Sequence, residues 1–431
     1  MATLNQVKVS REENLTTTPE LLQRQVEEIV QATPVTDMHT HLFAPQFGVL
    51  NLWGIDNLLN YHYLIAELFR SFDISAETYW QLGRAEQADL IWETLFVRNT
   101  PLSEATRGVV AVLSTLGLDP RAKNLQQARG FFKSQNLDNY LDQVLRLSNV
   151  SDIVMTNDPF DESEVKLWDQ GLSVDPRFHA ALRLDPILND WTAAAPQLGA
   201  RGYKVRDSID AETSSELRRF LDEWIARMGP LYLAVSLPDS FAYPDNSART
   251  WVLRDVVLPA CVQHDLPLSL MIGVRRNVNR ALRSAGDGLG RADMTAVHNI
   301  CSENPKNRFL ITMLSRENQH ELCVAARKFS NLLPFGCWWF LNNPSIVHEI
   351  CSERIELLGT RFVAQHSDAR ILDQLIYKWK HARRSIAGAL VAAYSELLED
   401  GRPVTREEIK RDARQMLSGN FREWVGLPQG N

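Results

Sequence analysis

The sequence contains little cysteine: five residues in a chain of 431, with no Cys-x-x-Cys pair. A disulfide framework is typical of short secreted chains that are rich in cysteine, and a thiolate zinc site needs closely spaced cysteines. We therefore expect reduced thiols and a cytoplasmic protein. The five residues are Cys261, Cys301, Cys323, Cys337 and Cys351.

Long apolar runs and an excess of positive charge are also missing. No stretch approaches the roughly 20 apolar residues that span a membrane, and residues 1–20 lack the apolar core of a secretory signal. The formal net charge is −7, whereas nucleic acids and anionic membranes bind basic surfaces. We expect neither partner, and a homo-oligomer is compatible with the sequence.

The chain also lacks repeats and linker-like segments, and short apolar runs alternate with helical patterns along it. This alternation is typical of a parallel sheet covered on both faces. We predict an α/β fold, a (β/α)₈ TIM barrel that includes residues 1–431 in one domain. Nine runs compete for eight strands, because "GYKV" (202–205) and "LYLAVSLP" (231–238) compete for one place. The other runs are 35–42, 150–157, 178–185, 266–274, 308–314, 332–340 and 361–368.

Three helical additions to the barrel are expected. Residues 1–33 form an N-terminal helical extension, whose helix begins at Thr18-Pro19. Residues 56–149 are far longer than an ordinary strand-to-helix connection and predict a helical insertion on the rim, a candidate lid. Residues 371–431 contain a long helix that ends at Gly401, and a capping box of Thr405 and Glu408 then opens another.

The stretch "VTDMHTHLF" contains two histidines at i and i+2, His39 and His41. Alternate residues of a strand share a face, so both imidazoles can reach one metal ion. The alternative is two histidines with local hydrogen bonds. Active sites of such barrels lie at the carboxyl ends of the strands, where this pair is expected, and this position favours the metal site.

A third, anionic ligand is expected from the end of another strand. Asp368, in "VAQHSDAR", closes the last apolar run, and the first and eighth strands of a barrel are neighbours. Asp368 could instead cap the following helix. His366 is a rival ligand or a core residue. Asp37 is expected to face the same way as His39, in a lower barrel layer or as a hydrogen-bond partner of a histidine.

Four cations follow predicted strands and suit an anionic, polyhydroxylated substrate, because guanidinium groups bind carboxylates in two-point contacts. Each could instead pair with a neighbouring acid. The four are Arg183, Arg316, Arg370 and Lys204.

Aromatic residues and a further histidine are also candidates. His62 and Tyr63 follow the first strand, and they are either core residues or acid, base or hydroxyl donors at the barrel mouth. Trp338 and Trp339 alternate along a predicted strand, so only one of them is expected to face the barrel. There it would fill the core or stack on a sugar.

These motifs, taken together, resemble the uronate isomerases, a (β/α)₈-barrel branch of the amidohydrolase superfamily. "DMHTHL", "YHYL", "ALRLDP", "LSREN", "WWF" and "SDAR" occur here in that order. The resemblance extends from about residue 20 to the last helix and is greatest to the divergent, non-canonical bacterial branch. It implies metal ligands at His39, His41 and Asp368. It implies substrate-binding and proton-transfer residues at His62, Tyr63, Arg183 and Arg370.

Two departures from the family pattern concern the metal. Canonical members have a histidine at the end of the fifth strand, where "LMIGV" places Met271. Methionine is a poor ligand in a nitrogen and oxygen site, so we expect three protein ligands. The common "TDSR" is "SDAR" here, through Ser367 and Ala369, which keeps the aspartate and the arginine.

The resemblance implies an aldose–ketose isomerase that interconverts D-glucuronate with D-fructuronate and D-galacturonate with D-tagaturonate. A divalent metal, expected to be zinc, would assist. In this interpretation Asp368, Arg370, Tyr63 and His62 are catalytic, and Arg183, Arg316, Lys204 and Trp338 also bind the substrate. The alternatives are a metal-dependent hydrolase or decarboxylase on the same barrel, and a sugar-acid-binding protein without activity.

Overall fold

A computed structural model describes residues 15–429 of the chain. Of the N-terminal extension expected at 1–33, residues 1–14 lie outside the described residues. The remainder contains β1 (Leu15–Thr16) and α2 (Pro19–Ala32). The helix begins as predicted, because Oγ1 of Thr18 accepts a hydrogen bond from the backbone N–H of Leu21 and Pro19 follows it.

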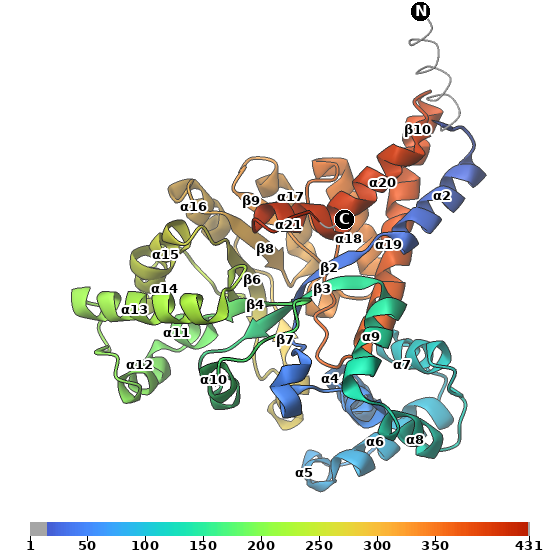
Figure 1. Cartoon of the computed structure of the whole chain (residues 1–431), viewed down its shortest axis with the longest axis horizontal. Helices are drawn as coiled ribbons and strands as arrows, with labels where there is room; N and C mark the ends of the chain where they lie inside the picture. Colours follow the sequence, from blue (N-terminus) through green and yellow to red (C-terminus); the bar gives the residue numbers. More distant parts are fainter. Residues whose placement is uncertain (1–14, 430–431) are drawn as a thin grey trace, which may run out of the picture.

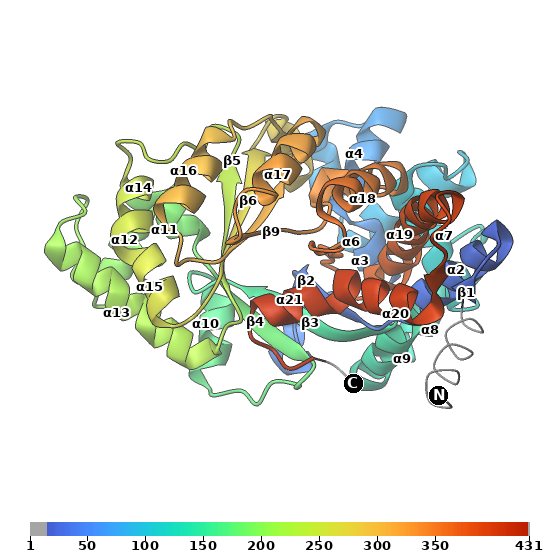
Figure 2. The same cartoon turned by 90° about the horizontal axis from the view of Figure 1, so that it is seen from above.

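A parallel sheet forms the centre of the molecule, and Figure 2 shows that it curls around on itself. Its strands follow one another in chain order, and every pair along this path is parallel. A short strand, β7 (Gly288–Leu289), pairs antiparallel with one of them. The strands are β2 (Val35–Thr40), β3 (Val150–Asn157), β4 (Phe178–Arg183), β5 (Leu233–Pro238), β6 (Leu268–Arg275), β8 (Phe309–Met313) and β9 (Leu332–Pro334).

The competition between two apolar runs for one strand is settled in favour of "LYLAVSLP", which forms β5. The run "GYKV" lies in the connection between α12 (Trp191–Ala200) and α13 (Ala211–Met228). Its Tyr203 is buried against Phe220 of α13, with ring centroids 5.4 Å apart. The run is apolar because it packs on a helix, so the expectation that Lys204 ends a strand is wrong.

The last apolar run, 361–368, has no regular strand but lies between β9 and β2. The backbone N–H of Val363 donates to the carbonyl of Pro334 in β9. On the other side, the N–H of Asp368 donates to the carbonyl of His39, and that of His41 donates to the carbonyl of Ala369. The first strand and the end of the last apolar run are therefore neighbours, as expected.

Helices cover the outside of the sheet (Figure 2). They include α16 (Thr295–Glu303), α17 (Gln319–Ala326) and α18 (Pro344–Leu358). One apolar cluster lies between these helices and the strands, and a second contains inward-facing residues such as Met38, Val154, Met271, Leu310 and Trp338. Among the described residues, no helix combines the length and apolar character needed to cross a membrane.

The segment between β2 and β3 is helical, and its helices α7 (Glu104–Thr115) and α9 (Leu137–Ser148) pack against the long C-terminal helix α19 (Gln374–Glu399; Figure 1). It is tied to the chain after Asp368 by the carboxylate of Asp373, which accepts hydrogen bonds from Gly54 N–H and from the Tyr140 hydroxyl. The helices are α3 (Ile55–Leu59), α4 (His62–Ser71), α5 (Ala76–Gln81), α6 (Arg84–Trp92), α7 (Glu104–Thr115), α8 (Gln126–Lys133) and α9 (Leu137–Ser148).

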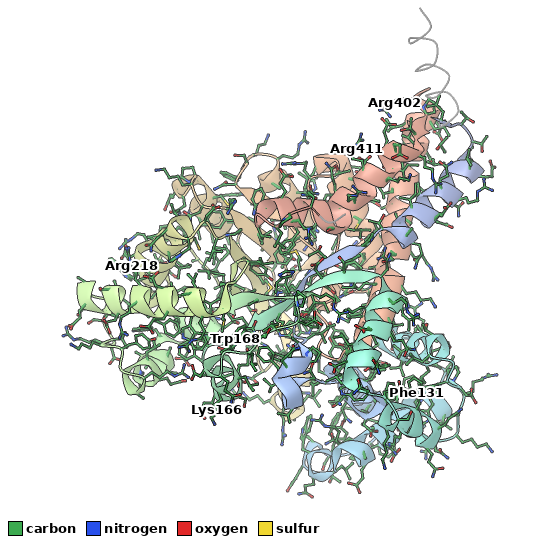
Figure 3. All side chains as sticks on the ribbon, in the orientation of Figure 1. Phe131, Lys166, Trp168, Arg218, Arg402 and Arg411 are labelled. Atoms are coloured by element: carbon green, nitrogen blue, oxygen red, sulfur yellow. The ribbon has the colours of Figure 1, made fainter. Side chains whose placement is uncertain are left out.

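The C-terminal segment begins with the long helix α19 (Gln374–Glu399), and the predicted capping box at Thr405 and Glu408 opens α20 (Arg406–Arg414). Figure 3 shows Arg402 and Arg411 of this segment at the opposite end of the molecule from Phe131 of α8. Arg422, in α21 (Asn420–Trp424), donates to the carboxylate of Asp152 near the start of β3. The helix α21 thus packs against the amino ends of β2 and β3.

Candidate active site

Three predicted ligands converge at the carboxyl end of β2. One ligand atom from each of His39, His41 and Asp368 lies within 4.8 Å of the other two. Nε2 of His39 is 3.7 Å from Oδ1 of Asp368, and Nε2 of His41 is 3.3 Å from the same oxygen. Two ligands that each lie about 2.1 Å from a tetrahedral zinc ion are about 3.4 Å apart. The spacing therefore suits one divalent cation between the three side chains.

Two polar atoms of this group are buried in a way that suits a bound cation. Nε2 of His39 and Oδ1 of Asp368 are buried without a hydrogen-bond partner in the part of the chain that is described, although buried polar atoms are normally satisfied. Burial lowers the pKa of His39 to about 3 and that of His41 well below its ordinary value. Both imidazoles are neutral, the form that binds metals. The residues present thus fit a divalent metal ion.

Asp368 reaches this position through an unusual backbone conformation. Its φ is 51°, in the left-handed region, which aspartate tolerates better than most residues. The preceding residue is held tightly: the carbonyl of Ser367 accepts hydrogen bonds from Nζ of Lys378, at 2.7 Å, and from Nδ2 of Asn342, at 3.1 Å. The turn that presents the carboxylate is therefore fixed from the side of α19.

The ring orientation of His41 is set by a hydroxyl on the neighbouring strand. Oγ1 of Thr156 is 3.1 Å from Nδ1 of His41, and it donates to the carbonyl of Thr40 at 2.8 Å. A hydroxyl has one proton, so this oxygen can only accept a hydrogen bond from the imidazole. The proton of His41 is thus on Nδ1, and the lone pair of Nε2 faces Asp368.

His39 has a longer contact of the same kind. The hydroxyl of Tyr232 donates to the carbonyl of Met38 at 2.6 Å, and its oxygen is 3.5 Å from Nδ1 of His39. The same reasoning places the proton of His39 on Nδ1. Partners of this kind orient metal-binding histidines in known sites.

His366, the rival ligand, lies outside the group of three. The His366 ring is buried, with its centroid 5.3 Å from that of His39. A Cβ at position 336 would lie 1.8 Å from Nδ1 of His366, so Gly336, with a φ of 57°, leaves the space for this ring. His366 is therefore a close-packed core residue.

Asp37 does not face the histidines, so that expectation is wrong. Its carboxylate accepts hydrogen bonds from the N–H of Ser367 and from Nε1 of Trp379, each at 2.9 Å. A register shift in β2 between Asp37 and Thr40 breaks the simple alternation on which the expectation depended. Asp37 instead braces the strand and the turn before Asp368.

Met271 is buried among the inward-facing apolar residues of the sheet. It pairs in register with Ser236 of β5 and Thr312 of β8. No histidine, cysteine or carboxylate from this strand joins the three ligands in the described residues.

His62 and Tyr63 open α4 beside the site. Nε2 of His62 accepts a hydrogen bond from Nε1 of Trp339 at 3.0 Å. The hydroxyl of Tyr63 is buried without a partner in the part of the chain described, and burial raises its pKa well above the ordinary value. The charge of Asp368 adds to that increase, so this hydroxyl remains protonated near the carboxylate.

The paired tryptophans differ from the simple strand alternation. β9 ends at Pro334, and Trp339 has a φ of 48° in the left-handed region. Trp339 contacts His62, and both Trp338 and Trp339 are buried in the inward-facing apolar cluster. Two buried indoles thus lie on this side of the sheet, where one was expected.

Two of the four predicted cations act on the site electrostatically. The charges of Arg370 and Arg183 contribute, after burial, to the lowered pKa of His41. Arg183 also pairs with Asp185, its Nη2 being 2.8 Å from Oδ1. The predicted alternative of a local acid partner therefore holds for Arg183 without removing it from the site.

The structure does not bring the other two cations to the site. Arg316 is 58% exposed and forms a two-point ion pair with Glu349 of α18, with distances of 2.8 and 3.0 Å. Lys204 is exposed in the connection between α12 and α13. The expectation of four converging cations fails for these two because Arg316, although it follows β8, turns its guanidinium to Glu349, and Lys204 follows no strand.

Arg276 is a cation that the sequence reasoning missed. It directly follows β6, its charge lowers the pKa of His41, and its Cζ is 5.6 Å from the ring centroid of Trp339. Its position after a strand end was the available signal. Thr156 and Tyr232 were also missed, because a hydroxyl that orients a histidine leaves no motif.

Comparisons with known proteins give close and distant structural matches. No family model matches the chain, and no curated protein matches it. The crystal structure of a uronate isomerase from Bacillus halodurans C-125 is 51% identical, with a TM-score of 0.94 over 96% of this chain and 98% of that one. A uronate isomerase from Thermotoga maritima is 15% identical, with a TM-score of 0.75 and coverage of 96% and 98%. A glucuronate isomerase from Caulobacter crescentus is also 15% identical, with a TM-score of 0.74 and coverage of 96% and 95%. The last two show the shared fold.

Proposed function

This chain belongs to the uronate isomerases, and from that membership we propose that it interconverts D-glucuronate with D-fructuronate and D-galacturonate with D-tagaturonate. It is an enzyme of the aldose–ketose isomerase class. The observation that supports the proposal is the cluster of His39, His41 and Asp368 with His62, Tyr63 and the two arginines beside it.

The reaction moves a proton from C2 to C1 of the open-chain sugar through a cis-enediol. The α-proton is weakly acidic, so the site must stabilise the charge that develops on the enediolate and must supply an acid and a base. The protonated hydroxyl of Tyr63 can donate a proton, and the carboxyl group of Asp368 lies near it, so the two groups are suited to this transfer.

We propose that His39, His41 and Asp368 hold a divalent metal, and that this metal is zinc. Three protein ligands would leave coordination positions open. When bound, such an ion polarises an oxygen of the substrate. Met271 in place of a fourth ligand is consistent with a weakly held metal.

The arginines suit the two ends of the substrate. Arg183 is held by Asp185 and is proposed to bind the carboxylate or a neighbouring hydroxyl. Arg370, whose charge reaches both His41 and His62, is proposed to stabilise the enediolate with Tyr63. Trp338 is proposed to lie against the substrate, whereas Arg316 and Lys204 are left out of this set.

The finer description of the fold is also a proposal. Seven parallel strands and the segment 363–369, which hydrogen-bonds to β9 and β2, support a closed (β/α)₈ barrel of amidohydrolase type in one domain. In this description residues 1–33, 56–149 and 371–431 are its N-terminal extension, rim insertion and C-terminal helices. The five cysteines are free, which supports the proposed cytoplasmic location.

The test is to incubate the purified protein with each uronate and to follow ketouronate formation, before and after treatment with a chelator. Isomerisation conserves mass, hydrolysis adds water and decarboxylation releases CO₂, so product analysis separates the three reactions. Absence of turnover with both sugars would refute the isomerase proposal. Turnover that survives complete metal removal would refute the role of the metal but not the reaction.

A further inference from the structure

The hydrogen bond between Trp339 and His62 has a chemical consequence for the imidazole. The indole Nε1–H can only donate, so Nε2 of His62, at 3.0 Å, must accept. An accepting nitrogen carries no proton. A neutral His62 therefore has its proton on Nδ1, and a protonated His62 would direct an N–H at the indole N–H.

The indole is held in place on several sides. Phe340 stacks on Trp339, with ring centroids 4.7 Å apart and an angle of 14° between the planes. The guanidinium of Arg276 lies over the ring of Trp339. The backbone of Trp339 has a φ of 48°, which for a bulky residue requires support from its surroundings. The donor is thus fixed in position before any ligand arrives.

The surroundings of His62 favour the neutral ring. The ring centroids of Tyr61 and Tyr63 lie 4.1 and 4.5 Å away. His62 is the first residue of α4, and the positive end of a helix disfavours another positive charge. Burial, followed by the charge of Arg370, lowers the pKa of His62 to about 3.

We propose that Trp339 is a positioning residue that holds His62 as the Nδ1–H tautomer, so that His62 donates a hydrogen bond to a substrate oxygen through Nδ1. Nε2, occupied by the indole, cannot then accept the proton from C2. This assignment of a donor role rests on the proposed function, whereas the tautomer itself does not.

This hydrogen bond reduces the number of groups that can transfer the proton of the substrate. With Nε2 of His62 engaged, Tyr63 and Asp368 remain as the groups that can exchange a proton with the substrate. A hydrogen bond from a fixed neutral donor also suits a sugar hydroxyl or carbonyl better than a cation would in this cation-rich surrounding.

The tautomer can be read directly in the substrate-free protein. Two-bond ¹H–¹⁵N correlations of protein labelled with ¹⁵N-histidine distinguish Nδ1–H, Nε2–H and doubly protonated rings. The chain has ten histidines, and the signal lost in His62→Gln assigns His62. We expect only the Nδ1–H form across pH 6 to 8. An Nε2–H or doubly protonated His62 in the unmodified protein would overturn the proposal without the need for any variant.

Trp339→Phe removes the N–H and keeps an aromatic ring. We expect the Nε2–H form to become populated, and kcat/KM for the uronate to fall by about tenfold or more, the effect of one lost hydrogen bond. Trp339→Gln restores an N–H donor, so it should recover part of the Nδ1–H population and part of kcat/KM. A pure Nδ1–H signal in Trp339→Phe would refute the positioning role.

Trp168 provides a matched control. It lies on α10 (Glu162–Asp169; Figure 3), and its Nε1 is buried without a partner among the described residues. Trp168→Phe should leave the His62 signal and kcat/KM unchanged. A shifted tautomer in Trp339→Phe with unaltered kcat/KM would refute the donor role. If the unmodified protein turned over neither uronate, the proposed function and the donor role would both fail, while an Nδ1–H spectrum would still support the tautomer assignment.

Discussion

Oγ1 of Thr156 lies 3.1 Å from Nδ1 of His41, which follows the neighbouring strand. The hydroxyl of Thr156 donates its proton to the carbonyl of Thr40, so its oxygen accepts a hydrogen bond from His41. The contact fixes the imidazole as the tautomer whose free nitrogen faces Asp368. A side chain outside the proposed metal site thereby determines whether a nitrogen of His41 is free to bind the metal.

Replacing Thr156 by valine should weaken metal binding by about 10- to 100-fold, because His41 loses the partner that fixes its tautomer and orientation. The measurement is the metal dissociation constant from competition with a chromophoric chelator. Thr156→Ser keeps the hydroxyl and should bind metal nearly as well as the unmodified protein.

Thr312 is the matched control for this variant, because its hydroxyl is buried without a partner in the described part of the chain. Thr312→Val should leave the dissociation constant within about twofold. Equal affinities of Thr156→Val and Thr312→Val would show that the hydroxyl of Thr156 does not orient His41.

Asp368→Asn should abolish turnover and reduce metal affinity while the protein remains folded. Asparagine is similar in shape and also tolerates the left-handed conformation found at this position, so the melting temperature of the metal-free protein should change by only a few degrees. Near-normal kcat in this variant would contradict the placement of Asp368 in the reaction.

The four predicted cations should separate into two classes. Arg316→Ala and Lys204→Ala should change kcat/KM by less than about twofold, because the first loses only an exposed ion pair and the second lies in the outer layer. Arg183→Ala should lower kcat/KM by about thirtyfold or more, because it removes the proposed contact between the guanidinium and the substrate. Removing one partner of a buried charge pair costs about 2 kcal/mol or more. Steady-state kinetics with both uronates measures the difference.

Glu164 predicts a pH dependence of stability. Burial raises its pKa to about 8, whereas glutamate in an unfolded chain titrates near about 4.3. The folded protein therefore holds this proton more tightly than the unfolded chain. The contribution of the proton to the free energy of unfolding is complete below about pH 4.3 and is lost as the pH rises to about 8. The expected slope is about 1.4 kcal/mol of unfolding free energy per pH unit within that window.

Denaturant unfolding between pH 5 and 8 measures this contribution in the unmodified protein and in Glu164→Gln. The glutamine variant should lose less stability as the pH rises. Glu162→Gln, an exposed change on the same helix, should follow the unmodified protein. Parallel stability curves for all three proteins would exclude a proton on buried Glu164.

The candidate metal cluster could be predicted from the sequence because His39 lies in β2 and Asp368 closes an apolar run whose end hydrogen-bonds to that strand. The HxH spacing places two imidazoles on one side, and Asp368 closes the last apolar run. These features depend on the order of the strands, which the alternation of apolar runs reveals. The capping box of Thr405 and Glu408 and the long helix α19 were predictable from local sequence patterns.

The failures came from tertiary contacts that a linear pattern does not contain. "GYKV" is apolar because Tyr203 packs on α13, which made Lys204 resemble a strand-end residue. Arg316 pairs with Glu349 on another helix. The register shift in β2 turns Asp37 away from the histidines, and the left-handed backbone of Trp339 turns an indole toward His62. Backbone irregularities of this kind are frequent at functional sites.

The pairing of β2 with the end of the last apolar run also determines when, during synthesis of the chain, the three proposed metal ligands can come together. His39 and His41 leave the ribosome long before Asp368 and the turn that presents it are made. A truncated or stalled chain offers two imidazoles and no carboxylate, so it binds the ion weakly. Because a ligand stabilises only the form that binds it, the cation would favour chains that already include Asp368 over chains that do not.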